Sequence, residues 1–222
     1  MPAGAPRSPA APTATTQHDG SPSIEVDRGP GARPEVALTF HGAGDPGLSR
    51  ALLEAAEAGH AAVTIFAVGT WLDATPALAR RVLQGGHELA NHTQRHLSDL
   101  KDQPEGVAEA EFARVAATLR RLTGSPGAFA RPSAMQHATP TVLAAAGRAG
   151  YATVLGYDVD PGDYLDPGAD LVVARALAAV RPGSVVSLHL GHAGTVAALP
   201  RVLAGLADRG LTPVTASRLL RA

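Results

Sequence analysis

Two histidines, His92 and His96, stand four residues apart in the segment Asn91-His92-Thr93-Gln94-Arg95-His96. On a helical turn, side chains at this spacing project from one face, so both imidazoles could bind one metal ion. The chain has nine histidines and no cysteine, so such a pair also arises by chance, and any zinc must be held by histidine and carboxylate. We therefore ask which other ligands could converge on this pair.

The composition limits the classes of protein that need to be considered. A length of 222 residues suits a single domain. We expect the protein to be a monomer. Lys and Arg number 19 against 20 Asp and Glu, so the chain has no excess of basic residues to bind phosphate backbones, and we expect no nucleic-acid partner. No apolar run approaches the roughly 18 residues of a membrane span, and residues 1–16 lack the apolar core of an export signal.

The elements that would position these histidines follow a repeated pattern. Residues 1–34 are rich in Pro and Ala without a periodic apolar face, and we predict a flexible leader before a catalytic domain over 35–222. From Glu35 onward, short apolar runs alternate with helical patterns, which predicts an α/β fold with about seven parallel strands. The expected strands are Val36 to Phe40, Ala62 to Val68, His87 to Ala90, Ala128 to Ala130, Ala152 to Tyr157, Ser184 to His189 and Thr212 to Val214.

Polar residues gather at or just after the ends of these expected strands. They are His41 and Asp45, His92 and His96, Arg131, Asp160 and Asp163, and His189. A doubly wound open sheet has the same local pattern, but polar residues after several different strands favour a βα barrel, whose βα loops build the active site. Their convergence also favours a metal site over a chance pair of histidines.

Five stretches in order carry a family resemblance: Leu38 to Asp45, Gly86 to His96, Arg131-Pro132, Asp160 to Tyr164 and Pro182 to His189. Over about residues 35–222 the chain resembles the polysaccharide deacetylases with the NodB homology domain, carbohydrate esterase family 4. The resemblance implies a distorted (β/α) barrel that removes acetyl groups from N-acetylated or O-acetylated glycans of cell-wall or chitin type. It also implies a divalent metal, with zinc as the expected ion.

The resemblance implies roles for individual residues as well. His92 and His96 match the two histidine ligands, and His189 matches the histidine that acts as general acid. Arg131 matches the arginine that orients the catalytic aspartate, and Asp163 matches the carboxylate that tunes the acid histidine. By the same analogy the Pro/Ala-rich leader suits a tether, so we expect an extracellular or wall-associated protein whose export signal is absent from this chain.

The first motif departs from the family pattern Thr-Phe-Asp-Asp-Gly, because the chain has Thr39-Phe40-His41-Gly42-Ala43. Three interpretations remain. The preferred one makes His41 the third metal ligand and Asp45 the general base, since zinc accepts three histidines in other hydrolytic enzymes. The second exchanges these two roles. In the third, the site has decayed and the protein only binds glycan. A hydrolase of small amides is a further alternative.

Other departures concern the substrate pocket. The third motif continues Ser133-Ala134-Met135 instead of Pro-Tyr-Gly, and Tyr164 replaces an expected tryptophan. Ser187 stands two residues before His189, at a position where leucine is common in the family. Leu190 directly follows His189, at a position where the family often has aspartate. We therefore expect an altered aromatic floor in the pocket.

Overall fold

The strands of the protein form one parallel sheet. The computed structural model describes residues 18–221. The strand order is β1-β6-β5-β4-β3-β2-β7, with β8 pairing with β2, and every ladder is parallel. The strands are β1 (Ile24–Val26), β2 (Glu35–Gly42), β3 (Thr64–Ala67), β4 (Glu88–Asn91), β5 (Phe129–Ala130), β6 (Thr153–Leu155), β7 (Val185–His189) and β8 (Thr212–Val214).

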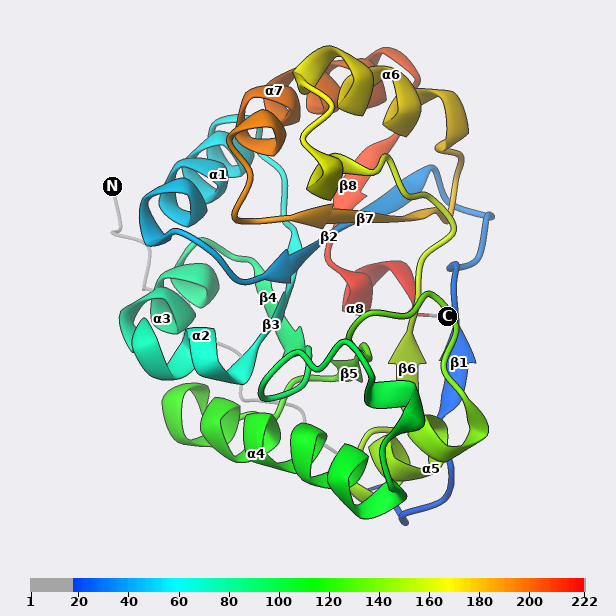
Figure 1. Ribbon diagram of the computed structural model, residues 1–222. Coiled ribbons are helices and arrows are strands. Elements are labelled where there is room, and N and C mark those ends of the chain that lie inside the picture. Colours follow the sequence, from blue (N-terminus) through cyan, green and yellow to red (C-terminus); the bar gives the residue numbers. More distant parts are fainter. Residues whose placement is uncertain (1–17, 222) are drawn as a thin grey trace, which may run out of the picture.

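Helices surround the strands, as Figure 1 shows. The α-helices are α1 (Pro46–Ala58), α2 (Gly69–Ala74), α3 (Pro76–Gln84), α4 (Glu105–Thr123), α5 (Pro140–Arg148), α6 (Ala169–Ala179), α7 (Ala193–Asp208) and α8 (Ala216–Leu219). Two short 3-10 helices, η1 (Leu100–Asp102) and η2 (Asp163–Leu165), lie in the connections. Among the residues described, no helix combines the length and the apolar character needed to cross a membrane.

The sheet curls toward a barrel but is not closed by a continuous ladder. Between the β1/β6 edge and β7, the described residues form isolated bridges, Arg28 with Ser184 and Val159 with Val186. The carboxylate of Asp158 accepts a hydrogen bond from the backbone N–H of Val185 in the same seam. The α/β fold with parallel strands is thus confirmed, and the open seam is the distortion of the barrel.

Seven of the eight strands fall where the sequence predicts them, with shifted ends. The eighth, β1, corrects the expected leader, because residues 24–26 pair in parallel with β6 instead of remaining free. Ser23 adds to this attachment, since its hydroxyl donates to the carbonyl of Tyr151. Residues 1–17 lie outside the described part of the chain, so the leader prediction applies to them alone.

The two faces of β2 explain how the sheet positions a site. Successive side chains on a strand point to opposite faces. Val36, Leu38 and Phe40 join the cluster that packs under the helices, whereas Ala37 packs with Phe66 and Val185 inside the barrel. Thr39 and His41 have the same parity as Ala37. His41 therefore ends the row of inward-facing residues, at the carboxyl edge of the sheet.

Candidate active site

His41 and His189 lie side by side at the carboxyl ends of two neighbouring strands. In the β2/β7 ladder, Thr39 is paired with Ser187 and His41 with His189. The two imidazoles stack with ring centroids 4.3 Å apart and an interplanar angle of 17°. Parallel pairing thus brings together two side chains that are 148 residues apart in the sequence.

His92 and His96 meet in a loop and not on a helical turn, which corrects the expected local structure. The loop follows β4, and two non-glycine residues in it, Thr93 and His96, have φ of 65° and 54°. The backbone N–H of Thr93 donates to Oδ1 of Asn91, which closes a tight turn around His92. The rings of His92 and His96 are 4.7 Å apart between centroids. The loop therefore achieves the proximity that the spacing suggested on a helix.

This loop is held from both sides. Backbone N–H groups of Gly69 and Thr70, at the start of α2, donate to the carbonyls of Thr93 and Gln94. On the other side, the buried carboxylate of Glu111 in α4 accepts from the backbone N–H and the side chain of Arg95. These hydrogen bonds fix the loop, so the side chains of His92 and His96 would be in place before any metal binds.

The three histidines His41, His92 and His96 form a group that could hold a metal ion. Each offers one ring nitrogen, and these nitrogens lie within 4.8 Å of one another. His41 Nδ1 is 2.7 Å from His92 Nε2. Among the described residues, no carboxylate belongs to this group. Imidazole nitrogens suit zinc and other borderline divalent ions, so the donor set fits the metal that the family resemblance implies.

The hydrogen bonds of His92 fix which of its nitrogens is available. His92 Nδ1 lies 2.9 Å from the carbonyl oxygen of Arg131, which can only accept, so Nδ1 carries the proton. The lone pair of the neutral ring is then on Nε2, which faces His41. Burial, with the nearby His96, holds the pKa of His92 well below its usual value, so the ring stays neutral. A neutral, oriented imidazole is what metal binding requires.

Arg131 is a buried cation beneath the histidines. Its guanidinium donates to the carbonyls of Leu155 and Gly156 and to Thr39 Oγ1, and it lies 4.0 Å from the centroid of the Phe66 ring. Within residues 18–221, none of its hydrogen bonds goes to a carboxylate. Burial lowers the pKa of Arg131 to about 9, so it remains charged at neutral pH.

The Arg131 charge affects His41 directly. Arg131 Nη1 lies 3.5 Å from His41 Nε2. Burial, together with His92 and this guanidinium, holds the pKa of His41 well below its usual value. A proton taken up by His41 would face a cation in a buried site, so the environment disfavours a general-base role and favours a neutral ligand.

His189 has the opposite kind of neighbour. Its Nδ1 lies 2.8 Å from Asp163 Oδ1, and its backbone N–H donates to Asp163 Oδ2. Asp163 is buried in η2, and its Oδ2 also accepts from the hydroxyl of Thr195 at the start of α7. Because the carboxylate accepts from Nδ1, His189 Nε2 is free for a second partner.

Asp45 is placed differently. Its Oδ1 accepts from the backbone N–H groups of Gly47 and Leu48, which makes it the N-cap of α1. The preceding Gly44 has φ of 101°, and a β-carbon there would lie 2.5 Å from the Cα of Gly191, so the loop packs closely against the β7–α7 connection. Asp45 lines neither of the two cavities around the histidines. The structure thus brings His41, His92, His96, Arg131, Asp163 and His189 together, but not Asp45.

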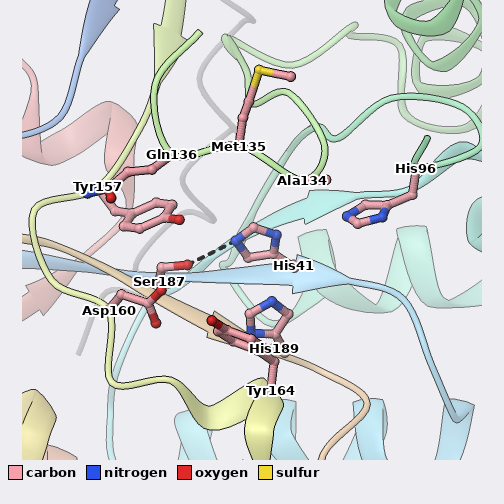
Figure 2. A pocket seen from close by; sticks show the side chains of 10 residues that line it. All are labelled: His41, His96, Ala134, Met135, Gln136, Tyr157, Asp160, Tyr164, Ser187 and His189. Atoms are coloured by element: carbon pink, nitrogen blue, oxygen red, sulfur yellow. Dashed lines mark hydrogen bonds between the residues drawn. The ribbon is translucent and has the colours of Figure 1, made fainter. Parts of the chain in front are cut away.

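A cavity of about 480 Å³ opens beside the histidines, with His41, His96, Ser187 and His189 in its wall (Figure 2). Its remaining wall includes the altered third-motif residues Ala134 and Met135, together with Gln136, Tyr157, Asp160 and Tyr164. A second cavity of about 250 Å³ shares His41, His96 and His189. Both cavities therefore lead to the same cluster of imidazoles.

Comparison with known proteins places this chain in a family. Residues 28–154 match the polysaccharide deacetylase family model. A chitooligosaccharide deacetylase of Sinorhizobium fredii is 35% identical over 207 residues, which cover 83% of this chain and 91% of the relative. A peptidoglycan-N-acetylglucosamine deacetylase of Bacillus cereus is 32% identical over 190 residues, covering 84% and 88%. The chain belongs to the polysaccharide deacetylase family, and the predicted family is confirmed.

Solved structures agree on the fold. A peptidoglycan N-acetylglucosamine deacetylase crystallised with a hydroxamate-type benzamide superposes with a TM-score of 0.82 at 27% identity, covering 88% of this chain and 92% of that one. A CE4 family pseudoenzyme from Bacillus anthracis superposes with a TM-score of 0.83 at 20% identity, covering 89% and 69%. The second likeness, at 20% identity, shows the fold alone.

The residues around the site that escaped the sequence analysis include Glu111, Thr195 and Tyr157. Glu111 left a trace in the sequence, because it falls on the apolar stripe of its helix with Ala108, Phe112 and Val115. A single acidic residue on the apolar face of a helix indicates a buried carboxylate that is paired with another group. Thr195 and Tyr157 left none, since their positions depend on how distant loops pack.

Proposed function

We propose that this protein is a metal-dependent deacetylase that hydrolyses the acetamido group of N-acetylglucosamine units in a cell-wall or chitin-type glycan. The names of the relatives from Sinorhizobium fredii and Bacillus cereus support this class of substrate. The single observation that carries the proposal is the placement of three neutral imidazoles next to a fourth, His189, whose partner is a buried carboxylate.

His41, His92 and His96 would hold the metal, with zinc as the expected ion. A divalent ion with three protein ligands and an open position lowers the pKa of a bound water to about 7 and polarises a carbonyl group. We assign His41 as a ligand rather than a base because Arg131 disfavours its protonation and because its Nδ1 faces His92.

His189 would transfer the proton. Hydrolysis adds water across the C–N bond, so one proton must leave the water and one must reach the leaving nitrogen. His189 Nε2 faces the cavity side of the site, and Asp163 stabilises the imidazolium that forms when this nitrogen takes up a proton. We propose that the same atom accepts the proton from the attacking water and returns it to the amine, which leaves acetate as the other product.

This assignment removes the need for a separate carboxylate base. Asp45 as the base remains a prediction from the sequence, but its contacts support a structural role at the start of α1. Asp163 would act only through His189, since both of its oxygens are already engaged by His189 and Thr195.

The relatives support the proposed substrate and location. The open cavity beside the imidazoles, with Tyr157 and Tyr164 in its wall, suits a sugar ring that presents its acetamido group to the histidines. We expect the protein to act as a monomer outside the cell membrane, where wall glycans lie.

The alternative of a protein that binds glycan without hydrolysing it is favoured by one observation, the absence of a carboxylate from the histidine group within the described residues. Acetate release from chito-oligosaccharides separates the two. We expect release by the zinc-loaded protein, loss of release after treatment with a chelator, and recovery on adding zinc. A protein that binds one equivalent of zinc and the glycan but releases no acetate would establish the binding role.

A further inference from the structure

Ser187 occupies a position that neither the family resemblance nor the proposed reaction assigns. It lies on β7 with the same parity as Val185 and His189, so its side chain faces the barrel interior, and it is 1% exposed. Its Oγ is 2.9 Å from His41 Nε2, the contact drawn as a dashed line in Figure 2. The hydroxyl thus reaches the nitrogen of His41 that points away from His92.

The proton positions around His41 constrain how it can bind a metal. His92 carries its proton on Nδ1, so its Nε2 is an acceptor for whatever lies opposite. His41 Nδ1 lies opposite, at 2.7 Å. Without a metal, this nitrogen can only donate a hydrogen to His92. To bind a metal through Nδ1, a neutral His41 must instead carry its proton on Nε2.

A proton on His41 Nε2 needs an acceptor. Among the described residues, the polar atoms within hydrogen-bond distance of Nε2 are Ser187 Oγ and Arg131 Nη1. A guanidinium has only donors, so Arg131 would oppose an N–H directed at it. A hydroxyl can donate or accept, so Ser187 is compatible with both tautomers of His41.

We propose that Ser187 is a positioning residue that accepts the Nε2–H of His41 and so leaves Nδ1 free to bind a divalent metal. The proposal rests on the metal site of the proposed function. It accounts for a hydroxyl at a position where the family commonly has leucine: a hydrocarbon there would leave Nε2 facing only Arg131 and would favour the tautomer whose Nδ1 is blocked by a proton. Partners of this kind fix the tautomer of ligating histidines in metal sites.

The test compares zinc affinity in three variants, measured by competition with a chelating dye on metal-free protein. Ser187→Ala should bind zinc about 10 to 100 times more weakly than the wild type, the usual loss for such a partner. Ser187→Thr keeps the hydroxyl and has the cavity beside it for the added methyl, so it should retain affinity. Ser184→Ala is the matched control, because it removes another buried hydroxyl just before β7, bonded to Asp158 and not to a histidine.

A spectroscopic measurement separates a tautomer effect from a general loss of structure. In zinc-loaded wild type, nitrogen-15 NMR of the imidazoles should show His41 protonated at Nε2. Equal zinc affinity in wild type and Ser187→Ala, or a His41 that binds zinc through Nε2, would overturn the inference while leaving the metal site intact. A wild type that binds no zinc would instead overturn the proposed metal site and, with it, this inference.

Discussion

The ends of β2 and β7 present the same side chain in two different settings. His41 and His189 are register partners with stacked rings, yet His41 faces the Arg131 cation and His189 faces the Asp163 carboxylate. A nearby cation disfavours protonation and leaves a neutral ligand, whereas a carboxylate stabilises the imidazolium and suits proton transfer. On the proposed function, the neighbouring charges would therefore make His41 a metal ligand and His189 the proton-transfer group, although both residues are histidines.

The largest expected effect comes from removing His92, a proposed metal ligand just after β4. His92→Ala should weaken zinc binding by more than about 100-fold, beyond the loss expected for an outer partner, and should abolish acetate release at micromolar zinc. His60→Asn is the control, because His60 is an exposed histidine outside the groups that could hold a metal, and asparagine tolerates its φ of 53°. Metal analysis after gel filtration and an acetate assay measure both effects. If His92→Ala bound as much zinc as the wild type, His92 would not be a metal ligand.

The next effect should fall on the β7 side and leave the metal in place. His189→Ala should keep one equivalent of zinc but lose about 100- to 10,000-fold in de-N-acetylation, the range expected for general acid–base catalysis. An activated acetate ester should lose much less, because its leaving oxygen needs no proton. Parallel assays on chitopentaose and 4-nitrophenyl acetate give the comparison. Equal losses on both substrates would speak against a proton donated to the leaving group.

The free energy of unfolding should depend on pH because of His41 and His92. Because the pKa values of His41 and His92 are lowered in the folded protein, the unfolded chain binds more protons at acid pH. Their stabilising contribution is complete above about pH 7.5 and is lost as the pH falls below about 6.5, by up to about 1.4 kcal/mol per pH unit for each histidine.

Urea unfolding of the metal-free protein at pH 5.5, 6.5 and 7.5 measures this slope. His41→Gln should reduce it by the share of one histidine, because glutamine does not titrate. An unchanged slope in that variant would mean that the folded environment of His41 does not resist protonation.

The smallest effect is expected at Asp45. Asp45→Ala should lower the free energy of unfolding by about 1 kcal/mol through loss of the helix cap, with acetate release within about twofold of wild type. Asp45→Asn keeps a capping side chain but cannot act as a base, so it should match the wild type in both stability and activity. A loss of more than about 100-fold in a stable Asp45→Asn would restore Asp45 as the base.

Much of the fold could be predicted because its pattern is local. Apolar runs alternating with helices specify a parallel sheet, and parallel strands put their carboxyl ends at one edge, so His41, Arg131 and His189 were expected near one another. β1 was missed because three residues beside a Pro- and Gly-rich stretch have too short a pattern, and only their pairing with β6 makes them a strand.

The site was less predictable where local chemistry competes with spacing. A helical turn was expected for His92 and His96, but left-handed backbone at Thr93 and His96 makes a loop. The sequence did contain a competing pattern at Asp45, since Asp followed by Pro is typical of a helix start. The contacts of Ser187 and Arg131 with His41 depend on packing between distant strands, which no local pattern records.

The most direct test is a crystal structure of the zinc-loaded protein with anomalous data at the zinc absorption edge. Our account predicts one zinc ion bound by His41 Nδ1, His92 Nε2 and His96 at about 2.0–2.1 Å, with Asp45 still capping α1. An ion bound by the Asp45 carboxylate, with His41 turned away from it, would contradict the account.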